Sequence, residues 1–292
     1  MMHSPSKKSR FLNKRTLGTT LRVFSFLLIS VVAVIVAIPF LWMISTSLKP
    51  DLHAVFQSPP QWIPHPLAWG NYLKAWNAAP FNRYLMNSVI VSVSTVAFEV
   101  VNACLTAYVF SKIRFPGRNL LFLLFLAVMM VPSQVIVVPN YIILSKLGWI
   151  DTYWALIVPF IASAYGTFML RQAFLGVPDD LVDAARVDGA SHLTILRHVM
   201  IPLNRPMILT FALLNFNWRW NDYFWTLIMT NSDAMRTLPV GVIAMQAGAE
   251  GGTNWHYMMA AAVIVILPVL VLFSITQRYF IEGISHTGLK GV

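Results

Sequence analysis

Six long apolar runs, separated by short polar segments, dominate the sequence. Residues 84–111 contain Glu99 as their only charged residue, and residues 206–230 contain only Arg219 and Asp222. The other four runs, residues 23–48, 119–145, 152–170 and 251–277, carry no Asp, Glu, Lys or Arg. Each run reaches the roughly 20 residues that a helix needs to cross about 30 Å of hydrocarbon. The pattern predicts an all-α, polytopic membrane protein with six transmembrane helices, whose cores are residues 23–45, 85–110, 120–144, 153–171, 206–229 and 258–278.

The composition agrees with this prediction. Hydrophobic residues make up 57% of the 292 residues and charged residues 11%, whereas a soluble domain usually carries about 25% charged residues. The net charge of +10 raises the question of nucleic acid. The basic residues are scattered between apolar runs instead of gathering on one predicted face, so no nucleic-acid partner is expected. The single cysteine, Cys104, lies inside an apolar run and is interpreted as a packing residue.

The distribution of Lys and Arg predicts the orientation. With the N-terminus inside, fifteen of these residues fall in cytoplasmic segments and five in external ones, and basic residues favour the cytoplasmic side. Both termini are therefore predicted to be cytoplasmic. The first run is expected to be a retained helix, since it is too long for a signal peptide and no small-residue cleavage site follows it.

The predicted organisation follows from these spans. It comprises a basic cytoplasmic segment (1–22), a six-helix transmembrane domain (23–280) and a cytoplasmic tail (281–292). The external loops are expected at about 46–84, 145–152 and 230–257, and a long cytoplasmic loop at about 172–205. The first external loop is rich in Pro and Trp, which suits the membrane interface, and Ala247–Gly252 is expected to be a flexible tract.

The long cytoplasmic loop predicts a helix, a glycine turn and a second helix. Pro178 suits the first helical position, and the acidic residues that follow it favour a helix N-terminus. Gly189 is placed to end this helix in a left-handed conformation, and Ser191 can cap the next one, which runs to Pro202. The small residues of the first helix, Ala184 and Ala185, leave it nearly bare, so that it can approach a partner closely.

This loop resembles a known family. Asp183-Ala184-Ala185, followed by Gly189 and then Ile201-Pro202, is similar to the "EAA" coupling loop of ABC importer permeases. Asp183 stands where that motif usually has Glu. Other segments resemble carbohydrate-uptake permeases of the maltose-transporter type: Pro39–Pro50, Ala107–Gly117, Trp220–Asp222, Gln277–Gly283 and Leu289–Gly291.

The resemblance implies a permease subunit of a binding-protein-dependent importer in the bacterial cytoplasmic (inner) membrane. It would form, with a second homologous permease, an alternating-access pathway for a sugar, with acidic or phosphorylated sugars among the candidates. Asp183, Ala184, Ala185, Gly189, Ile201 and Pro202 would couple the chain to a dimer of ABC ATPase subunits. An extracytoplasmic solute-binding protein and the lipid bilayer are the other implied partners. The chain itself needs no cofactor, because ATP and Mg would be used by the ATPase.

The missing motifs agree with a chain that is not an enzyme. No Gly-x-x-x-x-Gly-Lys-Ser/Thr phosphate loop, Gly-x-Ser-x-Gly elbow or His-Glu-x-x-His zinc motif occurs, and the histidines lack metal-ligand spacing. An ion-coupled secondary transporter is the alternative. It usually has internal repeats and buried ionisable groups, and only three buried ionisable residues are predicted here.

A polar patch in the fifth helix supplies the candidate substrate pathway. Its members, together with Glu99 of the second helix, are Asn217, Arg219, Trp220, Asn221, Asp222 and Tyr223. Polar groups in a membrane by default face the protein interior or an aqueous path. Helical spacing places Asn217, Trp220, Asn221 and Phe224 on one face. Three roles remain open for Arg219: it pairs with Asp222 or Glu99 and holds helices together, it attracts an anionic sugar, or it lines a pathway whose substrate contacts lie in the partner permease.

The second and third helices also contain polar residues and prolines. Interhelical hydrogen bonds are expected from their polar side chains, which are Asn87, Ser92, Ser94, Asn102, Ser133, Gln134 and Asn140. Pro132 and Pro139 are expected to kink the third helix.

Overall fold

The computed structural model describes residues 7–247 and 254–288, with side chains for residues 22–245 and 254–277. The described residues contain helices and no strand, as predicted. Apart from Ala247, the tract Ala247–Gly252 lies outside them, as does Leu289–Gly291. The helices are α1 (Lys7–Ser47), α2 (Leu52–Phe56), α3 (Gly70–Asn77), α4 (Phe81–Lys112), α5 (Arg118–Ala127), η1 (Val128–Met130), α6 (Ser133–Lys146), α7 (Tyr153–Ile157), η2 (Val158–Phe160), α8 (Ala164–Leu175), α9 (Asp179–Val187), α10 (His192–Ile195), the π-helix η3 (Leu196–Met200), α11 (Ile201–Leu203), α12 (Arg205–Trp220), α13 (Phe224–Met229), α14 (Leu238–Ala247) and α15 (Trp255–Gly288).

These helices form two compact units, Met1–Tyr72 with Asn254–Val263 and Leu73–Thr253 with Ile264–Val292. In the first unit, no residue of the most apolar 18-residue stretch of α1 is buried by the described part of the chain, as suits a helix that faces lipid or a partner. The segment after α1 folds back on its end. Asn71 Nδ2 donates hydrogen bonds to the carbonyls of Ser47 (2.9 Å) and Lys49 (2.7 Å), and the Ala68 N–H donates to the Leu48 carbonyl. These bonds satisfy carbonyls that the end of a helix leaves open.

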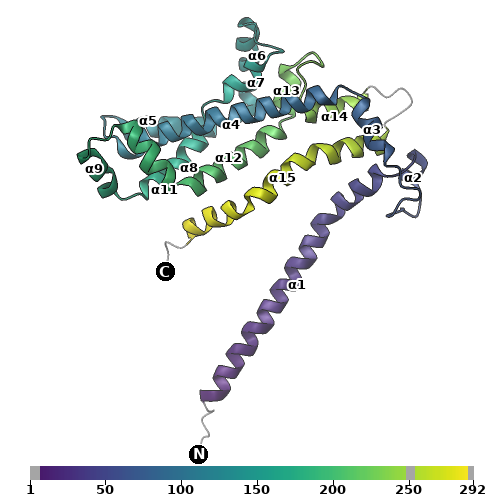
Figure 1. Ribbon diagram of the computed structural model, residues 1–292, viewed down its shortest axis with the longest axis horizontal. Coiled ribbons are helices and arrows are strands. Elements are labelled where there is room, and N and C mark those ends of the chain that lie inside the picture. Colours follow the sequence, from purple (N-terminus) through teal and green to yellow (C-terminus); the bar gives the residue numbers. More distant parts are fainter. Residues whose placement is uncertain (1–6, 248–253, 289–292) are drawn as a thin grey trace, which may run out of the picture. The chain divides into compact units, whose positions relative to one another are not determined.

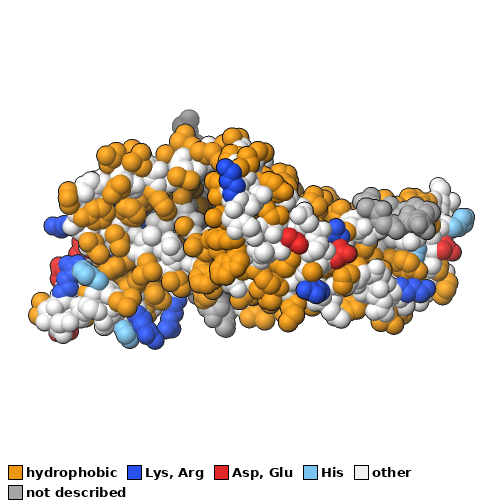
Figure 2. Space-filling view, turned by 90° about the horizontal axis from the view of Figure 1, so that it is seen from above, with side chains coloured by type: hydrophobic (Ala, Val, Ile, Leu, Met, Phe, Trp, Pro, Cys, Tyr) orange, Lys and Arg blue, Asp and Glu red, His pale blue; other side chains and the backbone are white. Residues whose placement is uncertain are grey.

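The second unit is built around α4, which packs against α7, α8, α12 and α14. Along α4, α9 lies at one end and α14 at the other (Figure 1). Buried apolar side chains from α4, α8, α12 and the segment between α8 and α12 form its largest core cluster: Ala103, Cys104, Ala107, Tyr108, Leu170, Phe174, Val177, Val182, Ile195, Leu196, Met200, Ile208 and Phe211. Hydrophobic side chains cover much of the visible face, while charged and histidine side chains lie at the end where α9 lies and also at other places on this face (Figure 2). A surface of this kind is typical of a protein whose flanks contact lipid.

Within the described part of the chain, four helical segments are long and apolar enough to cross a membrane. Two bent pairs, Arg118–Met130 with Ser133–Lys146 and His192–Leu203 with Arg205–Trp220, raise the number to six at most. The four are Arg22–Ser47, Phe81–Lys112, Tyr153–Leu175 and Trp255–Gln277, close to four of the predicted cores. One bent pair, Arg118–Met130 with Ser133–Lys146, turns by 96° and corresponds to the predicted core 120–144. The break falls at Val131–Pro132, where proline lacks the N–H that a continuous helix requires. The expected kink at Pro132 is therefore confirmed, while Pro139 lies inside α6.

Two predicted helices are interrupted. The prediction of one helix over 206–229 is wrong, because α12 ends at Trp220 and α13 starts at Phe224. Polar side chains replace the lost helical bonds there: Asn221 Nδ2 donates to the Asn217 carbonyl (2.8 Å), and Asp222 accepts from the Trp225 N–H (3.2 Å). The helix predicted over 153–171 is broken between η2 and α8, where the Ser163 hydroxyl caps α8. Short polar side chains compete with the helix for backbone groups in this way.

The segment Thr230–Thr237 is ordered by bonds to distant parts of the second unit. Asp151, which has a positive φ of 63°, accepts bonds at Oδ1 from the N–H groups of Asn231 (2.9 Å) and Ser232 (3.0 Å). Asn87 Nδ2 donates to the Ala234 carbonyl, and Asn87 Oδ1 accepts from the Tyr153 hydroxyl at 2.6 Å. The expected interhelical bond of Asn87 is thus present, between α4 and α7.

Candidate functional site

The first candidate site is a projecting helix–turn–helix, which we call the knob (residues 178–203). Its first helix, α9, begins at Asp179. Pro178 therefore occupies the N-cap position, not the first helical position that the sequence predicted. Gly189 has φ +80°. The Gly189 N–H donates to the Arg186 carbonyl and the Ala190 N–H to the Ala185 carbonyl, which is the Schellman arrangement. The Ser191 hydroxyl then accepts from the Thr194 N–H and caps α10. The predicted helix, glycine turn and cap are all present.

The second half of the knob is not a regular helix. The Ile201 N–H bonds to the Leu196 carbonyl, five residues back, which makes Leu196–Met200 one turn of π-helix. Pro202 follows directly and cannot donate to the His198 carbonyl four residues before it. A π-turn removes this conflict by widening the helix at the proline. Ile201 and Pro202 themselves are half-buried.

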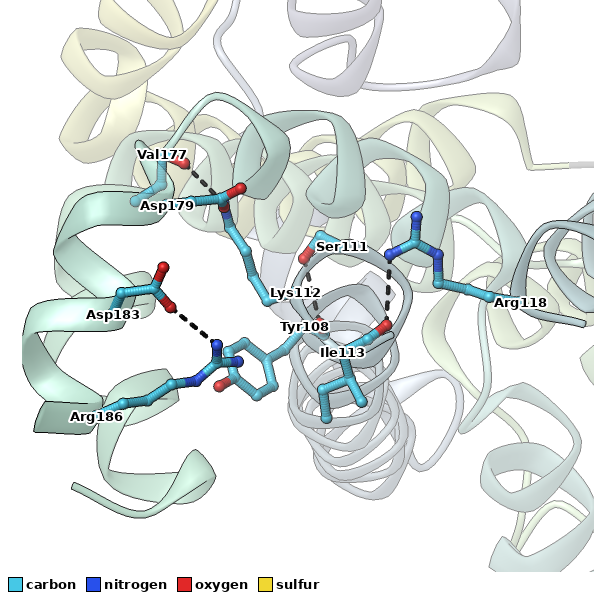
Figure 3. A network of polar contacts seen from close by, with 9 residues as sticks. All are labelled: Tyr108, Ser111, Lys112, Ile113, Arg118, Val177, Asp179, Asp183 and Arg186. Carbon is cyan, nitrogen blue, oxygen red and sulfur yellow. Dashed lines mark hydrogen bonds and ion pairs between the residues drawn. The ribbon is translucent and has the colours of Figure 1, made fainter. Parts of the chain in front are cut away.

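The last turn of α4 holds the knob from inside the second unit (Figure 3). Lys112 Nζ donates to the Val177 carbonyl (2.7 Å) and pairs with Asp179 Oδ1 (2.5 Å). The Lys112 side chain is 4% exposed and that of Asp179 72%. The hydrogen bond and charge of Lys112 lower the pKa of the Asp179 carboxyl. One turn earlier, the Tyr108 hydroxyl lies 3.0 Å from His192 Nδ1 at the start of α10.

The outward face of the knob is more apolar than its small residues suggested. Val182 and Ile195 turn into the core, and Ala185 packs partly against it. Ala184 and Gly189 are exposed as expected, and so is Asp183, which pairs with Arg186 at 2.9 Å. Four large apolar side chains of the knob are exposed as well: Leu181 (47% exposed), Val187 (88%), Leu193 (66%) and Leu203 (55%). The exposure of Leu181 and Val187 could have been predicted from the sequence. Leu181, Ala184 and Val187 recur every three residues and so share one face of the helix, which leaves Val182 on the buried face.

The second candidate site is a buried group of charges, the triad Glu99–Arg219–Asp222. Arg219 lies 3.8 Å from Glu99 Oε1 and 3.4 Å from Asp222 Oδ2. Its guanidinium carbon sits 3.6 Å from the centre of the Phe160 ring. The side chains of Glu99, Arg219 and Asp222 are only 4%, 13% and 18% exposed. The structure thus brings together both pairings that the sequence left open, and they link α4 to the break between α12 and α13.

The other patch residues diverge. Asn217, Asn221 and Phe224 are exposed, but Trp220 is buried, with Nε1 donating to the Val265 carbonyl at 3.1 Å. The predicted shared face of these four residues is wrong, because the helix stops at Trp220 and the helical spacing stops with it. Tyr223 lies half-buried in the break.

Comparison with known proteins places the chain. Residues 100–286 match the family described as binding-protein-dependent transport system inner membrane component. The sn-glycerol-3-phosphate transport system permease protein UgpE of Pectobacterium atrosepticum is 33% identical over 240 residues, which cover 80% of this chain and 85% of that protein. UgpE of Salmonella choleraesuis is also 33% identical, with the same coverage.

The chain belongs to this family. It is a permease subunit of an ABC importer of the inner membrane, and its relatives are transport permeases, not enzymes. The secondary-transporter alternative is not favoured.

Solved structures agree on the fold of the permease. A bacterial ABC transporter involved in the import of the acidic polysaccharide alginate matches with a TM-score of 0.78 at 23% identity, covering 96% of this chain and 100% of that one. A bacterial alginate ABC transporter in complex with an alginate pentasaccharide-bound periplasmic protein matches with a TM-score of 0.64 at 12% identity, covering 90% and 95%. At these identities the likeness is one of fold alone.

Proposed function

We propose that this permease pairs with a second, related permease, that two ABC ATPase subunits supply the energy, and that an external solute-binding protein delivers the substrate. ATP hydrolysis then resides on a separate subunit, and the knob is the part that docks onto it. The observation that carries this proposal is the outward face of the knob. Large apolar side chains, such as Val187 at 88% exposure, are exposed there together with small ones, and Lys112 binds the backbone just before this helix. Such a patch on a polar end of the molecule marks a protein contact.

The proposed topology has six spans and both termini in the cytoplasm. The bent pair at Val131–Pro132 counts as one span, and α12 with α13 as another, while His192–Leu203 is assigned to the knob and not to a span. The basic residues 1–22, the knob and the tail 281–292 then share the cytoplasmic side. The six spans lie within the predicted domain 23–280. The positive-inside distribution supports this arrangement.

We further propose an anionic substrate, a phosphorylated polyol or an acidic sugar. Support comes from the relatives named as sn-glycerol-3-phosphate permeases, at 33% identity. The triad argues against a simple role for Arg219 as the anion site, because two carboxylates already face its guanidinium. We therefore assign the triad to holding α4 against the α12–α13 break. An anion reaches Arg219 only by displacing Glu99 or Asp222, or meets its main contacts in the partner permease.

Uptake into vesicles tests the assembly and the substrate together. The permease, its partner permease, the ATPase subunits and the binding protein are reconstituted with glycerol 3-phosphate, a uronate or a neutral disaccharide outside. Uptake of an anionic compound that requires both ATP and the ATPase supports the proposal. Uptake by the permease alone, driven by a proton gradient, contradicts it, and uptake of the neutral sugar only would overturn the substrate class. In Arg219→Gln, equal loss of anionic and neutral transport would exclude charge recognition by Arg219.

A further inference from the structure

The segment Ala107–Gly117 resembles carbohydrate-uptake permeases, yet none of its residues belongs to the knob or to the triad. Its first part is the last turn of α4. Ala107 and Tyr108 are buried in the core beneath the knob, and Ser111 bonds back to the Tyr108 carbonyl. Lys112 at the end of the turn also reaches out of the helix, with its side chain still only 4% exposed.

This turn holds both helices of the knob at their starts. Lys112 binds the Val177 carbonyl and Asp179, where the chain leaves α8 and enters α9. Tyr108 binds His192, the first residue of α10. Figure 3 shows Lys112 reaching toward α9 and Arg186 of α9 directed back toward the Tyr108 ring. A displacement of the knob must therefore move this turn or break these contacts.

Beyond this turn, α4 is suited to carry a displacement away. It runs for 32 residues without proline or glycine, whereas its neighbours break between α7 and α8 and between α12 and α13. Glu99, in the middle of α4, faces Arg219, and Asn87, near its far end, fixes the segment around Ala234. One continuous helix thus connects the knob, the triad and the opposite end of the unit, and packed helices move as rigid elements.

We propose that the turn Tyr108–Lys112 transmits movement of the knob to the rest of α4, and that Lys112 and Tyr108 are positioning residues for energy coupling. The proposal rests on the proposed docking of the knob onto an ATPase. Fold stability alone does not account for Lys112, because an ion pair with an exposed carboxylate contributes little to it. The bond to the Val177 carbonyl instead fixes where α9 begins.

A spin label at the far end of α4 measures this transmission without knowledge of the substrate. Met86→Cys provides the label position, since Met86 is 64% exposed and the native Cys104 is buried. The purified complex with both permeases and the ATPases is compared without nucleotide and with ATP plus vanadate. In the otherwise unaltered chain, we expect ATP plus vanadate to change the spectrum of the label. In Lys112→Met this change should be at least about fivefold smaller, because about fivefold is the lower end of ordinary coupling between sites. Lys112→Arg, which keeps the donor and charge, restores it.

Lys146→Met is the matched control, because Lys146 also ends a helix, α6, but is exposed; its response should stay unchanged. A full response in Lys112→Met, or none in the unaltered chain, overturns the proposal. If Lys112→Met fails to assemble, Tyr108→Phe decides in the same way, since it removes only the hydroxyl. Failure of the unaltered permease to co-purify with the ATPase would instead contradict the proposed function.

Discussion

At the scale of single residues, the knob depends on one backbone conformation. Gly189 adopts φ +80°, and a Cβ built there meets no atom within 4 Å. A side chain at this position is thus opposed only by the left-handed conformation, which costs an ordinary residue about 1–2 kcal/mol. Gly117, with φ +79° and the same open surroundings, lies between α4 and α5, outside the residues of the knob. Equal substitutions at the two glycines therefore distinguish an effect of backbone strain from an effect on docking.

We predict that Gly189→Asp abolishes co-purification of the ATPase, while the permease still inserts in the membrane. The reason is a bulky charge placed on the face that we assign to docking. Gly117→Asp carries the same strain, so it should bind the ATPase as the unaltered chain does. Pull-down from detergent-solubilised membranes measures both variants. Equal binding by the two variants, whether kept or lost, would contradict the assignment.

The triad gives a second prediction at this scale. Removing a charged partner from a buried ion pair typically costs about 3–5 kcal/mol, because the remaining charge is left uncompensated. Arg219→Gln should therefore lower the thermal stability of the purified permease clearly. Adding Glu99→Gln should recover part of the loss, with a coupling of about 0.5–3 kcal/mol. Additive losses in the double variant would show that the two side chains do not interact.

At the scale of elements, the sequence predicted the spans better than their interruptions. Hydropathy located four long helices, because lipid selects the same apolar length wherever a helix crosses it. The end of α12 at Trp220 depends on Asn221 and Asp222 bonding to nearby backbone groups, and such competition leaves no trace in hydropathy. Gly189 was predictable because its geometry is local. The burial of Trp220 and the approach of Glu99 to Arg219 were not, since they depend on packing between helices distant in sequence.

Asp151 supplies a prediction about a connection between elements. Partial burial raises the pKa of its carboxyl, but hydrogen bonds from Ser232 and Asn231 outweigh this, and the pKa lies below its usual 3.8. A lowered pKa means that the ionised carboxylate stabilises the fold above the usual pKa, and that this contribution is lost as the pH falls through the folded pKa. The unaltered permease should thus unfold at higher temperature than Asp151→Ala at pH 7, with the difference shrinking below about pH 4. A difference independent of pH would contradict this role of the charge.

At the scale of the whole molecule, the proposed mechanism requires the knob and both termini on one side of the membrane and the segment Thr230–Thr237 on the other. The distance from Lys112 to Phe81 along α4 makes this possible, since 32 helical residues span about 48 Å, more than the hydrocarbon thickness. Asn87 and Lys112, near opposite ends of α4, bind Thr230–Thr237 and the knob, respectively. The two segments are therefore separated by the membrane if α4 crosses it.

Single cysteines at Val187 and Asn231 test this arrangement, because both positions are exposed and the native Cys104 is buried. We predict that a membrane-impermeant maleimide labels Asn231→Cys in intact cells and Val187→Cys only in inverted vesicles. A protease that removes a tag after residue 292 should act only in inverted vesicles as well. Labelling of both cysteines from one side would mean that α4 does not cross. Labelling of Val187→Cys from outside would reverse the orientation, and it would place the knob where no cytoplasmic ATPase could reach it.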